Sequence, residues 1–129
     1  MVIIIKADLF DLPVDAIVCS ANNWLKLGTG IAGQIKKRGG QVVQDDCFQV
    51  IKDMGGPIPI GNAIITSSGN LFSQIGHPKY IIHAIAMGYH RYDSGQVFER
   101  ILATQASVSQ SVNSALVIAE KNAIKTYSG

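Results

Sequence analysis

The sequence predicts one α/β domain with three layers. Short apolar runs of strand length alternate along the chain with segments whose apolar residues repeat at helical spacing. The run AIVC at 16–19 is continuous rather than alternating, as expected for a strand covered on both faces. With 129 residues, 47% of them hydrophobic, the chain can bury one core but leaves no room for a second domain.

Four segments read as strands, and a fifth begins like one. The β-branched runs at 2–5 and 16–19 are separated by a turn around Pro13. Residues 62–66 and 80–85 are strand-like and are joined by a loop rich in Ser, Gly and Asn. Residues 124–129 start in the same way at the end of the sequence.

Three helices are expected between these strands. The first runs from about residue 30 to 38 and ends at two glycines, and the second ends at Gly55 and Gly56. One apolar face of the second helix is predicted from Val43, Cys47, Val50, Ile51 and Met54. A long third helix is predicted from Ser94 as its N-cap. Its broad apolar face would comprise Val97, Ile101, Leu102, Val108, Val112, Leu116, Ile118 and Ala119.

The composition argues against several classes of protein. The net charge is only +2, and residues 36–38 form the one basic run, so nucleic acid binding through a basic stripe is not expected. The N-terminal apolar run has no preceding positive charge and reads as a strand rather than an export signal, and no apolar run reaches membrane-spanning length. Two cysteines do not form a disulfide framework, so a cytoplasmic location is expected.

The segment GTGIAG at 28–33 matches the GxGxxG pattern of dinucleotide-binding domains. That fingerprint requires a strand leading directly into the first glycine and an acidic residue at the end of the next strand. Here six residues, NNWLKL, separate the strand from Gly28, and the acidic residue at the right distance, Asp53, falls on a predicted helix. The context therefore disfavours a Rossmann site.

The glycines keep their physical meaning without that fingerprint. They let backbone N–H groups approach a ligand, and the following helix adds the positive end of its dipole, so the loop suits a phosphate. A tight structural turn that packs the helix onto the sheet explains the same glycines equally well.

Two ordered blocks of sequence resemble the macro domain family. The first is ADL…VDAIVCSANNWLKLGTGIAGQIKKRGG and the second is GNAIITSSGNL…KYIIHAI. Together they cover nearly the whole chain. The resemblance implies a three-layer α/β/α sandwich on a mixed sheet, with a cleft for ADP-ribose at the strand ends. It also implies ADP-ribose or an ADP-ribosylated protein as partner, with no cofactor and no metal.

The resemblance also assigns site residues. Asp8 would accept a hydrogen bond from the adenine amino group, and Asn22 would hydrogen-bond the distal ribose. Asp8 could instead be a surface aspartate, and Asn22 a turn residue. The glycine loop would wrap the diphosphate. The implied ligand-binding residues are Asp8, Leu9, Asn22, Gly28, Thr29, Gly30, Ile31 and Ala32.

Other side chains are expected to be structural. Trp24 would cover the core beside the loop, and His83 and Cys19 would be buried in it. The three histidines show no compact metal-ligand motif.

The chain departs from the pattern of family members that hydrolyse ADP-ribosyl bonds. Cys19, Ala32 and Lys36 stand where those members carry Asn, Asp and His. General-base hydrolysis then has no obvious agent, and the expected function is recognition of ADP-ribose or a related adenine nucleotide diphosphate. Two alternatives stay open. One is a hydrolase acting on ADP-ribosylated protein or a phosphorylated ADP-ribose, and the other is an assembly protein that has lost the ligand.

The end of the sequence suggests association. In the family's strand order, the first strand pairs with the last, and both flank a central strand that is expected to be missing after residue 129. The connection between 6 and 15 is too short for a parallel crossover from 2–5 to 16–19. Apolar strands with unpaired edges favour pairing with another copy, so a homo-oligomer is expected.

Overall fold

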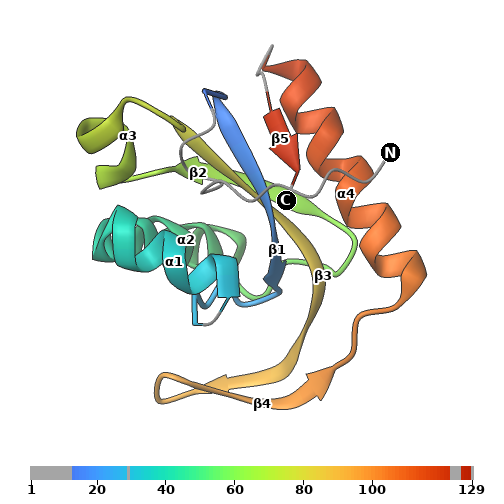
Figure 1. Ribbon diagram of the computed structural model, residues 1–129. Coiled ribbons are helices and arrows are strands. Elements are labelled where there is room, and N and C mark those ends of the chain that lie inside the picture. The colour runs from blue at the N-terminus through green and yellow to red at the C-terminus, as the bar shows by residue number, and fades with distance from the viewer. Residues whose placement is uncertain (1–12, 29, 123–125, 129) are drawn as a thin grey trace.

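The computed structural model describes residues 13–28, 30–122 and 126–128 and shows a sheet between two helical layers (Figure 1). Helices α1 (Gly30–Gly39), α2 (Gln41–Met54) and α3 (Asn70–Ile75) lie on one side, and α4 (Gln105–Lys121) lies on the other. The predicted three-layer α/β/α architecture on a mixed sheet is confirmed. None of the described helices is both long enough and apolar enough to cross a bilayer.

The sheet is organised around the parallel pair β1 (Ala16–Asn22) and β3 (Tyr80–Asp93). The order is β2-β3-β1-β5, with β2 (Ala63–Ser67) antiparallel to β3. The predicted strand at the end of the sequence is present as β5 (Thr126–Ser128), parallel to β1. The predicted strand at 2–5 lies outside the described residues.

Alternate residues of β1 and β3 face opposite helical layers. Ile17 and Cys19 pack under α1 and α2, whereas Ala16 and Val18 pack against Ala115 of α4. This alternation explains why the strand at 16–19 reads as a continuous apolar run, since both of its faces are buried.

The first two helices begin and end within a residue or two of their predicted bounds. Gly55 closes α2 in the left-handed conformation that glycine favours, with φ 79°. The prediction that Met54 belongs to the buried apolar face of α2 was wrong: Met54 is the last residue of the helix and is 57% exposed. The six-residue helix α3 falls in the segment predicted to be a loop.

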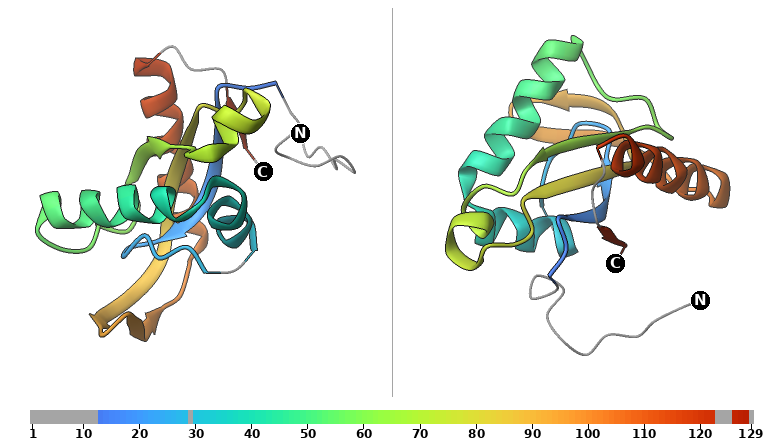
Figure 2. Two further views of the ribbon diagram at one scale, coloured as in Figure 1. Left: turned by 90° about the vertical axis from the view of Figure 1, so that its left-hand side faces the viewer. Right: turned by 90° about the horizontal axis from the view of Figure 1, so that it is seen from above.

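The prediction of a helix from Ser94 was wrong. Ser94 and Gly95 are the two central residues of a tight turn, with φ 52° and 82°, which joins β3 to β4 (Gln96–Ile101). Val97 and Ile101 are four residues apart, a spacing that fits one face of a helix but, being even, also one face of a strand. The hairpin projects beyond the helical layers (Figure 2). Helix α4 starts later, capped by Thr104 with Ser107 in a reciprocal capping box.

His83 is fully buried between the sheet and α2, as predicted for a core histidine. Thr66 Oγ1 donates to the Ser67 carbonyl, so it accepts from His83 Nε2, 2.9 Å away. The Sγ atom of Cys47 lies 3.8 Å from the same nitrogen. Burial lowers the pKa of His83 to about 4. The imidazole is therefore neutral in the folded protein at pH 7.

Acid should destabilise the fold through His83. The unfolded chain binds a proton below the usual pKa of 6.5, whereas the folded chain resists it down to about 4. The stability that the neutral His83 imidazole contributes is therefore fully present above the unfolded pKa and is lost as the pH drops. The free energy of unfolding falls by about 2 kcal/mol between pH 7 and pH 5. Urea unfolding at the two pH values measures this loss. His83→Gln should remove most of it, whereas His90→Gln, at an exposed position, should not.

An unchanged pH dependence in His83→Gln would contradict this account. Should that variant fail to fold, a ring titration of His83 by NMR in the unaltered chain tests the depressed pKa directly.

Candidate functional site

A cavity of about 230 Å³ opens where the carboxyl ends of β1 and β3 meet the start of α1. Because β1 and β3 are parallel, both chain segments leave the sheet at this edge, the place where open α/β sheets bind ligands. The described residues that line the cavity are Ser20, Ala21, Asn22, Lys26, Leu27, Gly28, Ala32, Met87, Tyr89 and Val97.

Asn22 shapes the loop that follows β1. Its Oδ1 accepts hydrogen bonds from the backbone N–H groups of Trp24 (3.0 Å) and Lys26 (3.2 Å), and its Nδ2 donates to the Lys26 carbonyl (2.9 Å). Leu25 takes a left-handed conformation with φ 54° inside this turn. Asn22 thus has the turn role considered from the sequence. One Nδ2 hydrogen is still available for the predicted ribose contact.

Gln44 of α2 holds the same loop through hydrogen bonds to its backbone. It is 2% exposed, and its amide donates to the Leu25 carbonyl and accepts from Leu27 N–H, both at 2.8 Å. Sequence reasoning missed this residue. The sequence feature that could have identified Gln44 was a polar residue next to Val43 on the buried face of an amphipathic helix.

Asn23 joins the loop to the hairpin. Its Oδ1 accepts from Tyr89 N–H and its Nδ2 donates to the Tyr89 carbonyl, both at 2.9 Å. Asn23 is 6% exposed, and its amide lies against Gly88, where any Cβ would overlap it. A glycine is therefore required opposite Asn23.

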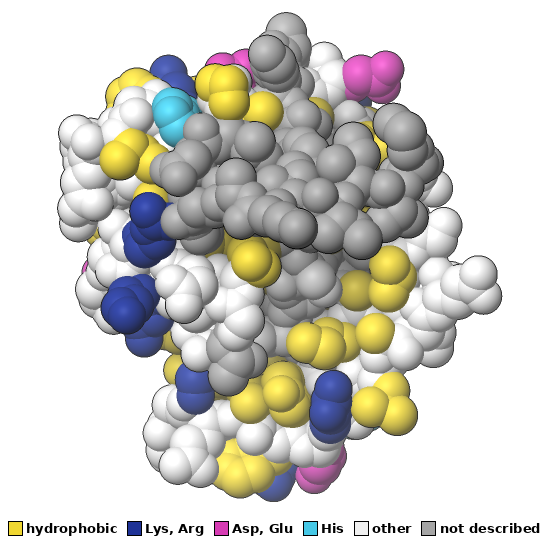
Figure 3. All heavy atoms as spheres, viewed as in Figure 1, with side chains coloured by type: hydrophobic (Ala, Val, Ile, Leu, Met, Phe, Trp, Pro, Cys, Tyr) yellow, Lys and Arg dark blue, Asp and Glu magenta, His cyan; other side chains and the backbone are white. Residues whose placement is uncertain are grey.

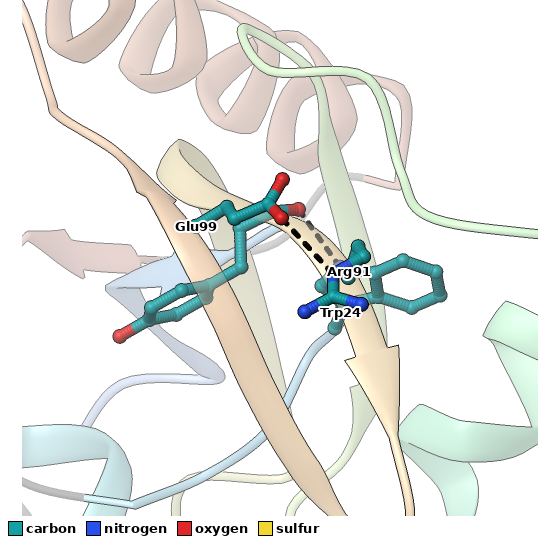
Figure 4. A network of polar contacts seen from close by, with 4 residues as sticks. Trp24, Arg91 and Glu99 are labelled. Carbon is teal, nitrogen blue, oxygen red and sulfur yellow. Dashed lines mark hydrogen bonds and ion pairs between the residues drawn. The ribbon is translucent and has the colours of Figure 1, made fainter.

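Trp24 packs on the hairpin, beside the loop. Its indole Nε1 donates to the Tyr89 carbonyl at 2.9 Å, and its ring lies 5.6 Å from the ring of Tyr92. The ion pair between Arg91 and Glu99, at 3.1 Å, joins the two strands of the hairpin (Figure 4). The hairpin thus forms a fixed wall of the cavity and contributes Tyr89 and Val97 to its lining.

The glycine loop contributes part of the predicted set. Gly28 and Ala32 line the cavity, Gly30 begins α1 with φ 60°, and Ile31 is 39% exposed outside the lining. A Cβ at Gly33 would lie 2.9 Å from the Gly28 carbonyl, so this glycine lets the helix close onto the loop. The predicted residues Asp8, Leu9 and Thr29 lie outside the described part of the chain.

The positions that depart from the hydrolase pattern lie in different surroundings. Cys19 is 1% exposed and belongs to the apolar layer under α2, and burial raises its pKa to about 12. Ala32 is in the cavity wall, and Lys36 follows one turn later on α1. Among the described lining residues there is neither a carboxylate nor a histidine.

Comparison with known sequences identifies the family. Residues 18–128 match the family model for the macro domain. The chain belongs to the macro domain family. It is 42% identical over 82 residues to a macro domain-containing protein of Caldanaerobacter subterraneus subsp. tengcongensis, an alignment that covers 64% of this chain and 43% of that protein.

A second curated relative carries an enzyme name. The chain is 32% identical over 99 residues to O-acetyl-ADP-ribose deacetylase 1 of Pantoea vagans, covering 75% of this chain and 54% of the relative. The chain thus spans about half the length of each of these two macro domain proteins.

Solved structures confirm the fold. A variant of the Oceanobacillus iheyensis macrodomain solved with ADPR superposes with a TM-score of 0.70 at 22% identity, covering 92% of this chain and 57% of that one. The macrodomain of Mycobacterium tuberculosis DarG gives 0.66 at 20% identity, with 92% and 68% covered.

Removing the Asn23 amide should loosen the hairpin wall. Asn23→Ala leaves the part-buried Tyr89 N–H without its acceptor, which should cost about 1–3 kcal/mol of stability. Chemical denaturation measures the loss, and Trp24, the one tryptophan of the chain, reports locally by fluorescence. Asn113→Ala, at an exposed position of α4, is the matched control. Equal unfolding midpoints for the two variants would rule out the proposed role of Asn23.

Proposed function

We propose that this macro domain recognises ADP-ribose or a related adenine nucleotide diphosphate in the cavity beside β1. One observation carries the proposal: Asn22, Gly28 and Ala32, assigned to the ligand by the sequence resemblance, line a single cavity. Solved macrodomains of Oceanobacillus iheyensis with ADPR and with ADP share the fold, which supports the choice of ligand.

The size of the cavity limits what its described walls can hold. Sites for drug-sized ligands usually enclose about 300–1,000 Å³, whereas this cavity has about 230 Å³. We propose that the described walls take the diphosphate and distal ribose. The adenine would then be bound by Asp8, as the family resemblance implies, with Leu9 as a further ligand-binding residue.

The glycine loop supplies the chemistry for the diphosphate. Apart from the chain neighbours of Gly28, no described residue has a heavy atom within 4 Å of a Cβ built on it, which supports close approach of a ligand to the backbone there. The ten-residue helix α1 has no acidic residue in its first turn, so its positive end is not neutralised from within the helix. Both features favour a phosphate over a neutral group.

Calorimetric titration with ADP-ribose, ADP, AMP and NAD tests the proposal. ADP-ribose should bind, and Asp8→Ala should weaken ADP-ribose and AMP by about 1–3 kcal/mol, the range for losing a hydrogen bond to a charged group. Asp53→Ala, at an exposed position of α2, controls for the loss of one negative charge. If Asp8→Ala binds both ligands unchanged, the adenine has been placed wrongly. No binding of any of the four would favour an assembly protein instead.

A hydrolase is the second candidate, because a relative that aligns with 75% of the chain is named O-acetyl-ADP-ribose deacetylase 1. The described walls offer no general base, so we expect no release of ADP-ribose from ADP-ribosylated protein or of acetate from O-acetyl-ADP-ribose. Chromatography of the products measures both reactions. Turnover by the unaltered chain, lost in Asn22→Ala, would establish the hydrolase instead.

The residues missing from the hydrolase pattern can be restored for comparison. Ala32→Asp adds a carboxylate to the cavity wall, whereas Cys19→Asn buries an amide in the apolar layer under α2. The single change at 32 is therefore the better first variant, and the double change tests the complete pattern.

Partners and location follow as proposals. An ADP-ribosylated protein would present the same ligand to the cavity. A cytoplasmic location is proposed from Cys19 and Cys47, which are both free thiols and so suit a reducing compartment. Self-association is proposed from the sheet edge. Contrary to the prediction, β1 does not supply that edge, because it pairs with β3 on one side and with β5 on the other, whereas among the described strands β2 pairs only with β3. Light scattering measures the oligomeric state.

A further inference from the structure

Lys26 is the one charged side chain among the described residues that line the cavity. It is half-buried and belongs to the loop shaped by Asn22, two residues before Gly28. The remainder of the described lining consists of apolar residues, serine, asparagine, tyrosine and glycine. On the face of the molecule shown in Figure 3, Lys and Arg side chains lie at several separate places. The electrostatic character of the described cavity therefore depends mainly on Lys26.

The Lys26 ammonium is oriented without being neutralised. Its Nζ donates to the carbonyl of Gly95 at the turn of the hairpin. A carbonyl oxygen fixes the direction of the side chain but cancels none of its charge. The ion pair found among the described residues joins Arg91 to Glu99, and it does not involve Lys26. Two of the three ammonium hydrogens thus remain available to a ligand.

The hairpin that supplies this carbonyl is itself held in place. Asn23 and Trp24 both bind the backbone of Tyr89, and Tyr92 packs on the Trp24 ring. The Gly95 carbonyl that Lys26 contacts therefore belongs to a hairpin whose position is held by these side chains. A lysine held in one direction loses less side-chain entropy when it binds a ligand than a free surface lysine does.

We propose that Lys26 is a specificity-determining residue, whose ammonium binds a phosphate oxygen of the diphosphate at the hairpin side of the cavity. This inference rests on the proposed function and adds a side-chain cation to the backbone amides of the glycine loop. It predicts selection by charge: diphosphates bind through Lys26, whereas a neutral nucleoside gains nothing from it.

The test compares four probes, namely ADP-ribose, ADP, inorganic pyrophosphate and adenosine, by calorimetry with the full chain at low and high salt. Lys26→Met should weaken the three diphosphates about 10- to 100-fold, the loss expected for a charge-assisted hydrogen bond. It should also flatten the salt dependence of their binding, because the screened charge has been removed. Lys26→Arg keeps the charge and should recover most of the affinity.

Lys121→Met is the matched control. It removes the same charge from the last turn of α4, on the opposite side of the sheet from α1, and should leave all four affinities unchanged. Trp24 fluorescence and thermal unfolding establish that each variant is folded.

Two outcomes would overturn the inference. In the first, Lys26→Met binds ADP-ribose and pyrophosphate as the unaltered chain does. In the second, the variant weakens adenosine as much as the diphosphates and keeps the salt dependence, which would mean that Lys26 only holds the hairpin. The proposed function fails separately: Lys26-dependent binding of pyrophosphate without binding of ADP-ribose would refute the ADP-ribose site and support the role of Lys26.

Discussion

The parallel pairing of β1 with β3 is the constraint on which the site depends. Its register runs regularly from Ala16 opposite Tyr80 and shifts only where Asn22 comes to lie opposite Met87. Beyond that shift β1 turns into the glycine loop, while β3 continues out of the sheet into the hairpin. Where β1 and β3 diverge, their backbone N–H and C=O groups no longer pair with each other and need other hydrogen-bond partners. The Asn23 amide takes both polar groups of Tyr89 and keeps the diverging segments at a fixed separation. The cavity is the space between them.

Side-chain amides, together with the buried Leu25 and Leu27, define the shape of the loop. Asn22 folds it back on itself, Gln44 ties it to α2, and Asn23 ties it to β3. Each of these bonds replaces a partner that the loop backbone would otherwise find in water, so removing one leaves a buried or part-buried group unsatisfied. Such a network favours a single geometry for residues 22–27, the segment that leads into the glycine loop.

The sequence predicted the layers, the first two helices and the glycine loop because each has a local signal: periodicity, end glycines or a motif. The prediction failed where one spacing of apolar residues fits both a helix and a strand. The spacing of Val97 and Ile101 suits a helix and a strand alike, and only the adjacent Ser94-Gly95 pair marks the hairpin. The role of Asn23 was hidden for another reason. Its partner is 66 residues away in the chain, and nothing local distinguishes this asparagine from a surface turn residue.

Cys19 and Ala32, two of the positions that depart from the hydrolase pattern, lie in chemically different surroundings. Cys19 points into the apolar layer with Ile17, so its replacement of an asparagine changes the core beneath the loop. Ala32, by contrast, belongs to the cavity wall, at the position where the family resemblance implies an acid in the members that hydrolyse ADP-ribosyl bonds. What the described wall retains is rich in hydrogen-bond donors: the Lys26 ammonium, the remaining Asn22 N–H and the backbone of the glycine loop. Donors of this kind hold an anion but cannot accept a proton from water. These donors support the proposed phosphate-bearing ligand, and the described lining residues include neither a carboxylate nor a histidine beside them.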